Sequence, residues 1–176
     1  MTFYVARHGQ TEWNAENKVC GITDIPLTEK GIAQADELAV QVKEKNIEII
    51  ISSPMKRAVA TSRIISEKWH IPMMTDDRLV EQNYGVYEGV DRNDELFLAN
   101  KKNFAYRYPD GESMMQVAAR VYTFLNEIKK QYDGKNVLII SHGGVCRIIK
   151  TYFNDMTNEE FFRYTLQNCK LEEYKA

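Results

Sequence analysis

The chain has 176 residues, of which 44% are hydrophobic, so it carries enough apolar material for one domain with a sizeable core. Its 23 basic and 25 acidic residues are well mixed and give a net charge of −2, which favours neither nucleic acid nor a membrane surface as a partner. The sequence contains no targeting segment, no apolar run of membrane-spanning length, and no disulfide or zinc spacing among its three cysteines. We therefore expect one cytoplasmic domain over residues 1–176, of undetermined oligomeric state, that acts on a small molecule.

The predicted elements alternate between strands and helices along the chain. Three apolar runs, such as Ile49-Ile50-Ile51, are typical of strands covered on both faces. Between them, apolar residues recur at steps of three and four, as in amphipathic helices, and a Ser113-x-x-Gln116 capping box marks the start of one helix. In chain order we predict a strand over 2–6, a helix over 28–45, a strand over 48–52, helices over 54–69 and 113–132, and a strand over 136–141.

This alternation indicates an α/β fold, namely a three-layer α/β/α sandwich with a mostly parallel central sheet. Cys146 and Cys169 adjoin apolar or β-like stretches and are predicted to be core residues. The charged run over 170–175 is predicted to be a solvated terminal edge. In the helix over 28–45 we expect one shared apolar face, formed by Ile32, Ala35, Leu38, Ala39 and Val42.

Ionisable side chains follow each of the three predicted strands. The first strand is followed by Arg7-His8-Gly9, the second by Ser53-Pro54 with Arg57 shortly after, and the third by His142-Gly143-Gly144. Because ligands of such sheets lie beyond the carboxyl ends of the strands, we expect these two imidazoles and two guanidiniums to converge there. The cluster suits a phosphoryl group, since arginine pairs with its oxygens, a histidine nitrogen can attack phosphorus, and glycine N–H groups can approach an anion.

Taken one at a time, the candidate residues have simpler interpretations. An arginine or histidine after a strand is usually a solvated end, and Glu81 alone would be a surface carboxylate near a turn. His70 stands at a helix end, where a basic side chain meets the negative end of the dipole, so we assign it no chemistry. Aromatic residues between Tyr84 and Tyr108 are more often packing than recognition, although Tyr84 is a candidate substrate contact.

Six spaced stretches of the sequence form a recognisable pattern. They read RHGQTEWN, GITDIPLTEKGIAQA, SSPMKRAVATS, LVEQNYGVYEG, DGES and SHGG. In this order, and over nearly the full chain, they resemble the histidine phosphatase superfamily, the phosphoglycerate mutase-like group. The combination of spaced motifs is far more specific than a lone R-H-G.

The resemblance implies a role for the residues that match the strongest motifs. His8 would be the nucleophile and Glu81 the proton donor, while Arg7, Arg57 and His142 would form the phosphate pocket. In such a mechanism His8 attacks phosphorus as Glu81 protonates the leaving alkoxide, and water then hydrolyses the phosphohistidine. The resemblance thus implies a phosphatase that needs no cofactor.

Other matches are weaker. Thr11 and Asn14 would line the phosphate pocket, Cys20 and Gly21 would lie near the substrate, and Gly143 would offer a backbone N–H to it. No metal is expected, because fixed positive side chains can carry the electrostatic stabilisation. The sequence also has no H-E-x-x-H motif, no carboxylate cluster at ligand spacing and no G-x-x-x-x-G-K-[ST] nucleotide loop.

The acceptor of the phosphoryl group decides between a phosphatase and a cofactor-dependent phosphoglycerate mutase. Mutases of the family are longer chains, with a larger insertion before the second histidine and with ionisable side chains directly after the glutamate. In this sequence Glu81 is followed by the neutral pair Gln82-Asn83. Water is therefore the expected acceptor. If Lys101, Lys102 and Arg107 point into the cleft, they would anchor a second anion and restore weight to the mutase.

The segment over 88–110 is predicted to be a helical cap that sets the substrate. It carries no motif that selects among the substrates of short family members, which include α-ribazole phosphatases, sugar-phosphate phosphatases and broad phosphomonoesterases. A function of another class is a silent or protein-directed member that docks a phosphoprotein. The intact set of His8, Arg57, Glu81 and His142 argues against silence.

Overall fold

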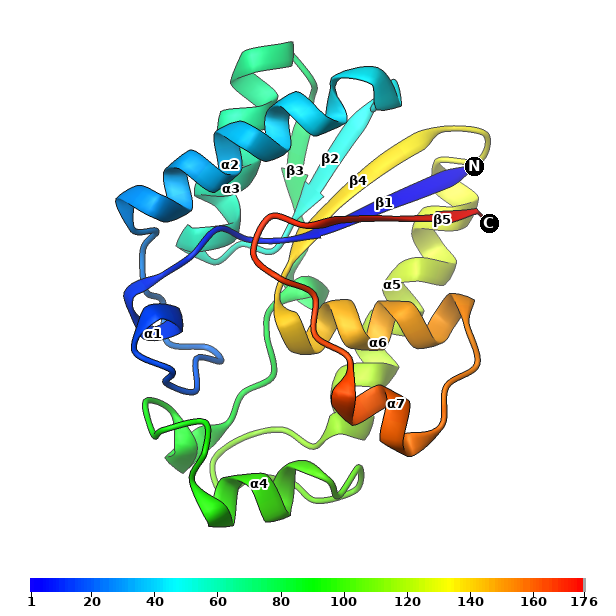
Figure 1. Ribbon diagram of the computed structural model, residues 1–176. Coiled ribbons are helices and arrows are strands. Elements are labelled where there is room, and N and C mark those ends of the chain that lie inside the picture. The colour runs from blue at the N-terminus through cyan, green and yellow to red at the C-terminus, as the bar shows by residue number, and fades with distance from the viewer. Residues whose placement is uncertain (176) are drawn as a thin grey trace.

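A five-stranded sheet forms the centre of the protein, whose computed structural model describes residues 1–175. The strand order is β3-β2-β4-β1-β5, and all neighbours are parallel except β5, which runs antiparallel to β1 (Figure 1). The predicted α/β class with a mostly parallel sheet is confirmed. The strands are β1 (Thr2–Arg7), β2 (Ile49–Ser52), β3 (Met73–Thr75), β4 (Asn136–Ser141) and β5 (Leu171–Lys175).

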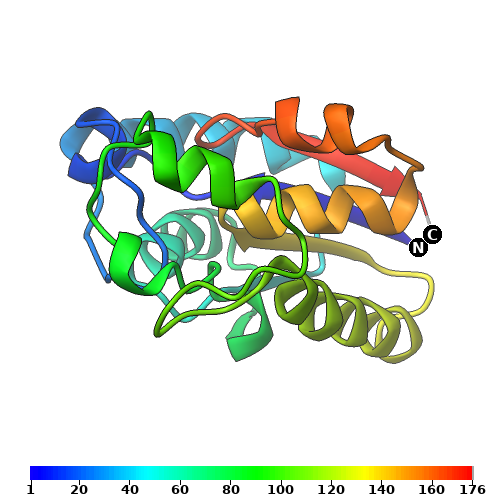
Figure 2. The same cartoon turned by 90° about the horizontal axis from the view of Figure 1, so that it is seen from below.

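Helices cover both faces of the sheet and complete the three predicted layers (Figures 1 and 2). Alternate residues of β1 point to opposite faces: Phe3 and Val5 pack with α5 and α6, whereas Tyr4 and Ala6 pack with α2 and α3. The helices are α1 (Glu12–Ala15), α2 (Glu29–Val42), α3 (Lys56–Trp69), α4 (Glu95–Lys101), α5 (Met114–Gln131), α6 (Gly143–Phe153) and α7 (Asn158–Arg163). Short 3-10 turns occupy Lys43–Lys45, Asp77–Leu79 and Gly85–Tyr87.

Local sequence signals set the helix starts. The predicted capping box is present at α5, where Ser113 Oγ accepts from the N–H of Gln116 at 3.2 Å and the Gln116 side chain accepts from the Ser113 N–H at 2.8 Å. The face predicted for α2 was wrong at Ile32, which is 47% exposed. The chain at Gln10 crosses the helix at Gly31 instead, so the buried stripe begins one residue earlier.

Two strands are missing from the sequence prediction. The 170–175 run is not a free solvated edge, because Leu171–Lys175 pairs with β1 as the edge strand β5. Tyr174 anchors this strand: it is only 7% exposed, and its ring stacks on Phe153 with centroids 4.8 Å apart. The second missing strand, β3, has only three residues. Cys146 and Cys169 are buried, as predicted.

The segment over 88–110 contains one helix, α4, which lies in front of the sheet when the molecule is seen from below (Figure 2). A separate aromatic cluster holds it against the N-terminal loop, and its buried members are Val19, Tyr87, Phe97 and Tyr108. The same cluster brings Phe97 and Lys101 of α4 to the edge of a cavity beyond the strands. Among residues 1–175, no helix combines the length and the apolar character that a membrane crossing requires.

Candidate active site

The central strands deliver both imidazoles to one place. β1 lies beside β4 with Arg7 opposite Ser141, so the chain continues from the two strands into His8 and His142 side by side. The centroids of the two rings are 5.0 Å apart. β2 lies on the other side of β4 and leads through Ser53 into α3, which carries Arg57. The predicted convergence at the carboxyl ends of these strands is therefore observed.

His8 is held as a neutral ring with one free nitrogen. Its Nδ1 lies 2.6 Å from the carbonyl oxygen of Gly9, which can only accept, so Nδ1 carries the proton and Nε2 keeps its lone pair. Burial lowers the pKa of His8 well below its usual range, and the charges of Arg57 and Arg7 lower it further. Residue 9 must be glycine, because a Cβ there would collide with the backbone oxygen of Gly31.

Arg57 and His142 are fully buried and do not line the cavity. Arg57 Nε donates to His142 Nδ1 at 3.2 Å, so His142 Nε2 is left to donate to Ser53 Oγ at 2.8 Å. The other guanidinium nitrogens of Arg57 donate to the carbonyls of Gly21 and Thr23. Burial, then the charge of Arg57, lowers the pKa of His142 well below its usual range. The prediction that Arg57 and His142 line the phosphate pocket directly is therefore wrong.

Arg7 lines the cavity, and one of its N–H groups has no hydrogen-bond partner among residues 1–175. Its Nη1 donates to the carbonyl of Leu166 at 3.2 Å, and the N–H group without a partner in that range is on the buried Nε. Burial lowers the pKa of Arg7 to about 10, yet it stays charged at neutral pH. Beside it, Gly143 and Gly144 begin the eleven-residue helix α6, whose N-terminus carries partial positive charge. The guanidinium of Arg7 and the N-terminus of α6 therefore place positive charge on the same side of the cavity, which favours an anion there.

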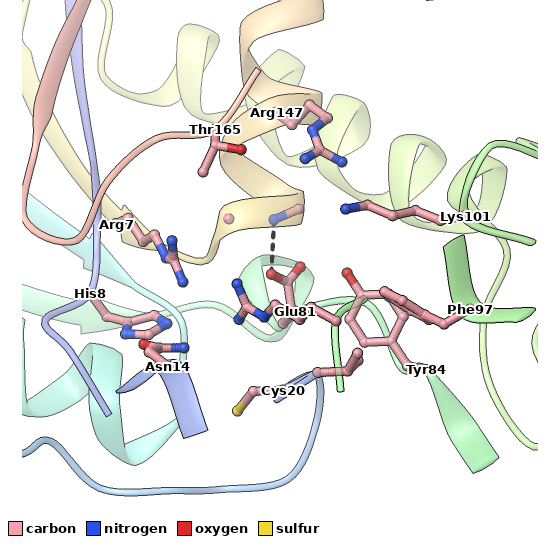
Figure 3. Close-up of a pocket in the computed structure, with 14 residues that line it drawn as sticks. Arg7, His8, Asn14, Cys20, Glu81, Tyr84, Phe97, Lys101, Arg147 and Thr165 are labelled. Carbon is pink, nitrogen blue, oxygen red and sulfur yellow. Dashed lines mark hydrogen bonds between the residues drawn. The ribbon is translucent and has the colours of Figure 1, made fainter. Parts of the chain in front are cut away.

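Glu81 lines the same cavity as His8 (Figure 3). Its Oε2 accepts from the N–H of Gly144 at 2.8 Å and its Oε1 from the N–H of Gln82 at 2.9 Å, so the side chain is fixed in place. It is only 5% exposed, and no ion pair among residues 1–175 involves it. A Cβ at position 144 would lie 2.5 Å from Glu81 Oε1, which explains the second glycine of SHGG.

Thr11 and Asn14 have different positions. Asn14 lines the cavity as predicted, but Thr11 does not. Thr11 is fully buried and caps α1, where its Oγ1 accepts from the Asn14 N–H at 3.3 Å and its own N–H donates to Asn14 Oδ1. Asn14 is further held by Asn168. Thr11 therefore positions Asn14, and its hydroxyl group is engaged in capping α1.

Cys20 lines the cavity as predicted, whereas Gly21 contributes only its carbonyl, which accepts from Arg57. The loop that carries them is held by Glu88, a residue to which the sequence motifs assign no role. Its carboxylate accepts from the backbone N–H groups of Gly21, Ile22 and Thr23 and from Thr23 Oγ1 at 2.7 Å. The only signal for this role is the E-G pair that follows Tyr87.

Tyr84 and Gly143 line the cavity as predicted, together with several residues that the sequence did not reveal. Of the three possible anchors for a second anion, Lys101 reaches the cavity, while Lys102 and Arg107 do not. Arg107 instead donates to the carbonyl of Gly111. The lining residues that sequence reasoning missed are Val19, Arg92, Phe97, Arg147 and Thr165. Arg147 stands one helical turn after Gly143 on α6, a spacing that could have revealed it.

His8 and His142 are both expected to stay neutral at acidic pH values where a free imidazole, whose pKa is about 6.5, takes up a proton. In nitrogen-detected NMR titration of a His70→Asn variant, which keeps only His8 and His142, the ring signals should keep their neutral positions through pH 6. Because the unfolded chain then binds more protons than the folded one, the free energy of unfolding should fall as the pH falls below about 6.5. Imidazolium signals at pH 6.5 would contradict this electrostatic description.

Within residues 1–175, no three histidine, cysteine, aspartate or glutamate side chains are grouped around one point as a metal site requires. The charged groups around the cavity are instead the guanidinium and ammonium groups already described and the carboxylate of Glu81. The arrangement can therefore place a nucleophilic nitrogen, cationic donors and one carboxyl group around a single bound oxyanion.

The chain is similar in sequence and in fold to known proteins. The chain is 35% identical over 147 residues to the uncharacterized phosphatase PhoE of Bacillus subtilis, covering 84% of this chain and 74% of that protein. It is 33% identical over 180 residues to the probable phosphoglycerate mutase GpmB of Escherichia coli, covering 97% and 83%. The α-ribazole phosphatase of Shigella flexneri has the same fold, with a TM-score of 0.85, 24% identity and coverage of 98% and 89%. The family model of the histidine phosphatase superfamily, branch 1, matches residues 3–176, and the chain belongs to this superfamily.

Proposed function

We propose that this protein is a phosphomonoester hydrolase that acts on a small phosphorylated metabolite through a phosphohistidine on His8. One observation carries the proposal: neutral His8, whose Nε2 keeps its lone pair, lines the same cavity as the guanidinium side chain of Arg7 and the carboxyl group of Glu81. Membership of a family with phosphatase relatives supports it. Residues 1–176 would act as one cytoplasmic catalytic domain, with the segment over 88–110 as its cap.

In the first step, His8 Nε2 attacks the phosphorus as the bond from phosphorus to the ester oxygen breaks. Glu81, in its protonated form, gives its proton to the leaving alkoxide. Water then attacks the phosphohistidine, the Glu81 carboxylate takes the proton of that water, and His8 regains its lone pair. Arg7 and the N-terminus of α6 stabilise the charge on the phosphoryl oxygens, with Arg57 behind them. These groups supply the stabilisation that a metal provides elsewhere, so we propose a metal-independent reaction.

A mutase is the second candidate, and the similarity to GpmB together with Lys101 at the cavity favours it. The neutral pair after Glu81 does not serve a second phosphate, because Gln82 Nε2 donates to the carbonyl of Glu112 and Asn83 Nδ2 to that of Asp110. Water therefore remains the proposed acceptor. A protein-directed member that only docks a phosphoprotein is the third candidate. A histidine with a free ring nitrogen inside the cavity favours turnover over docking.

A phosphoester panel separates these functions. The purified chain should release inorganic phosphate from at least one phosphomonoester in a set that includes α-ribazole 5′-phosphate, sugar phosphates and 3-phosphoglycerate, at a rate that EDTA leaves unchanged. Formation of 2-phosphoglycerate from 3-phosphoglycerate only when 2,3-bisphosphoglycerate is added, without phosphate release, would establish the mutase instead. Loss of activity in EDTA that zinc or magnesium restores would refute metal independence. Binding of a phosphoprotein without any turnover would leave the docking function.

A further inference from the structure

The DGES motif of residues 110–113 takes no part in the proposed chemistry, yet it lies against the segment that carries Glu81. Glu112, the third residue of the motif, contacts the two residues that follow Glu81. Its N–H donates to the carbonyl of Asn83 at 2.8 Å, and its Oε2 accepts from the N–H of the same residue at 3.0 Å. Its carbonyl accepts from Gln82 Nε2 at 3.0 Å. The backbone and the side chain of Glu112 therefore fix the chain just beyond Glu81.

Arg120 of α5 binds the backbone at Glu81 and just before it. Its Nη1 donates to the carbonyls of Arg78 and Val80, both at 2.6 Å, and its Nη2 donates to the carbonyl of Glu81 at 3.3 Å. Its Nε and Nη2 also donate to the two carboxylate oxygens of Glu112, at 3.2 Å and 3.1 Å. All five N–H groups of the guanidinium are thus used. The ion pair of Arg120 and Glu112, with its hydrogen bonds to residues 78–83, is called the arginine fork below.

The backbone at Glu81 depends on the arginine fork. Residues 81–84 belong to no helix or strand, so no regular hydrogen-bond ladder fixes the chain that carries the carboxyl group. A guanidinium is planar and rigid, so the carbonyls that it binds are held in direction as well as in distance. The side chains of Arg120 and Glu112 are only 19% and 27% exposed, so water screens their hydrogen bonds only in part. The fork therefore sets where the chain lies at Glu81.

The arginine fork itself stays out of the cavity. Neither Arg120 nor Glu112 is among the described residues that line the cavity, and their opposite charges pair with each other. The carboxyl group of Glu81, by contrast, lines the cavity and accepts from the N–H groups of Gly144 and Gln82. The shortest route from the fork to the cavity is therefore the backbone of Glu81.

We propose that Arg120 and Glu112 are positioning residues that hold Glu81 where its carboxyl group can reach the leaving oxygen of the substrate. The proposal rests on the proposed phosphatase function, in which Glu81 protonates that oxygen. Phosphate binding depends on Arg7 and the N-terminus of α6, to which no hydrogen bond of the fork leads within residues 1–175. Loss of the fork should therefore impair proton transfer more than phosphate binding, and a misplacement of about 1 Å can cost roughly 10²-fold in rate.

Arg120→Gln tests the fork through the leaving group. Glutamine has two N–H donors in place of five, so kcat/KM for alkyl phosphates should fall by about tenfold or more, and that for p-nitrophenyl phosphate by less than about threefold. Arg120→Lys keeps the charge on a single nitrogen and should recover little of the loss. Wild-type rates in Arg120→Lys would overturn the proposal. So would equal losses on both substrates in Arg120→Gln alongside a selective loss in Glu81→Gln, a result that leaves the acid standing.

Arg78→Gln is the matched control. Arg78 lies in the same segment and also joins it to α5, through an ion pair with Glu127, but among the described residues its side chain donates to no backbone group. This variant should keep kcat/KM within about twofold of the wild type on both substrates. If circular dichroism shows that Arg120→Gln is unfolded, Glu112→Gln is assayed in its place. It weakens the fork from the other side and should show the same selective loss.

An NMR measurement locates the carboxyl group of Glu81 without turnover. Gly144 is the second residue of α6, so its N–H has no acceptor within the helix and donates instead to Glu81 Oε2 at 2.8 Å. The amide proton shift of Gly144 in Arg120→Gln should move toward its value in Glu81→Ala, whereas Arg78→Gln should leave it unchanged.

The same signal separates this proposal from the proposed function. An unchanged Gly144 signal in Arg120→Gln would refute the arginine fork, whatever the activity of the variant. A shifted signal, in a chain whose wild type hydrolyses no phosphoester, would refute the phosphatase and leave the fork standing. If the loss in Glu81→Gln does not depend on the leaving group, the acid role fails and the Gly144 signal alone decides the fork.

Discussion

Replacement of His8 by alanine is expected to lower phosphatase turnover by at least about 10³-fold, because it removes the proposed nucleophile and leaves Glu81 with no phosphohistidine to form or hydrolyse. The fold should survive. The lost interactions are the hydrogen bond from Nδ1 to the Gly9 carbonyl and the packing of one ring, and the bond is worth about 1 kcal/mol of the free energy of unfolding. Steady-state assays on a phosphomonoester, with circular dichroism to check folding, measure both effects.

His70→Asn is the matched control for this variant. His70 is exposed at the end of α3 with φ 54°, a left-handed conformation that asparagine accepts, so this replacement should leave both activity and fold unchanged. Turnover of His8→Ala above the background of the assay, in a preparation shown to be free of wild-type protein, would refute the role of His8.

Glu81→Gln is expected to slow hydrolysis of alkyl phosphates by about 10²-fold or more, because glutamine cannot give a proton to the leaving alkoxide. Hydrolysis of p-nitrophenyl phosphate should fall much less, since its leaving group is stable as an anion. The amide has one acceptor oxygen where the carboxylate has two, so one of the N–H groups of Gln82 and Gly144 loses its partner, at a cost of about 1–3 kcal/mol in stability. The measurement is kcat/KM over a series of leaving groups.

Glu88→Gln provides the comparison, because Glu88 holds the loop with Gly21 and Thr23 and does not line the cavity. Loosening this loop should affect all substrates alike, whatever their leaving group. If Glu81→Gln shows the same flat profile as Glu88→Gln, then Glu81 positions other groups and is not the acid.

The parts of the fold that the sequence predicted are those with strong local signals. Continuous apolar runs identify β1, β2 and β4, and the Ser113 capping box identifies the start of α5. β5 escaped prediction because Leu171-Glu172-Glu173-Tyr174-Lys175 has few apolar residues, and it becomes a strand only through pairing with β1. Ile32 was misplaced because the chain at Gln10, distant in sequence, covers its neighbour Gly31.

The candidate site likewise has residues that the sequence predicts and residues that only the structure reveals. Arg7, His8 and His142 follow strands, so the rule for parallel sheets brings them together from sequence alone. Whether Arg57 lines the cavity or lies behind it depends on the carbonyls of Gly21 and Thr23, whose positions are set by tertiary contacts. Arg92 and Arg147 belong to no sequence motif. Only the folded structure, with α4 packed over the strand ends, shows that both line the cavity.

Trapping of the covalent intermediate is the most direct measurement of the central claim. The wild type is mixed with a rapidly cleaved phosphomonoester, quenched in alkali within milliseconds to preserve phosphohistidine, digested, and analysed by mass spectrometry. The mechanism predicts one added phosphoryl group on the peptide that contains His8, formed during the first turnover and lost as water reacts. A burst of product without any modified peptide, or with the phosphoryl group on another residue, would contradict it.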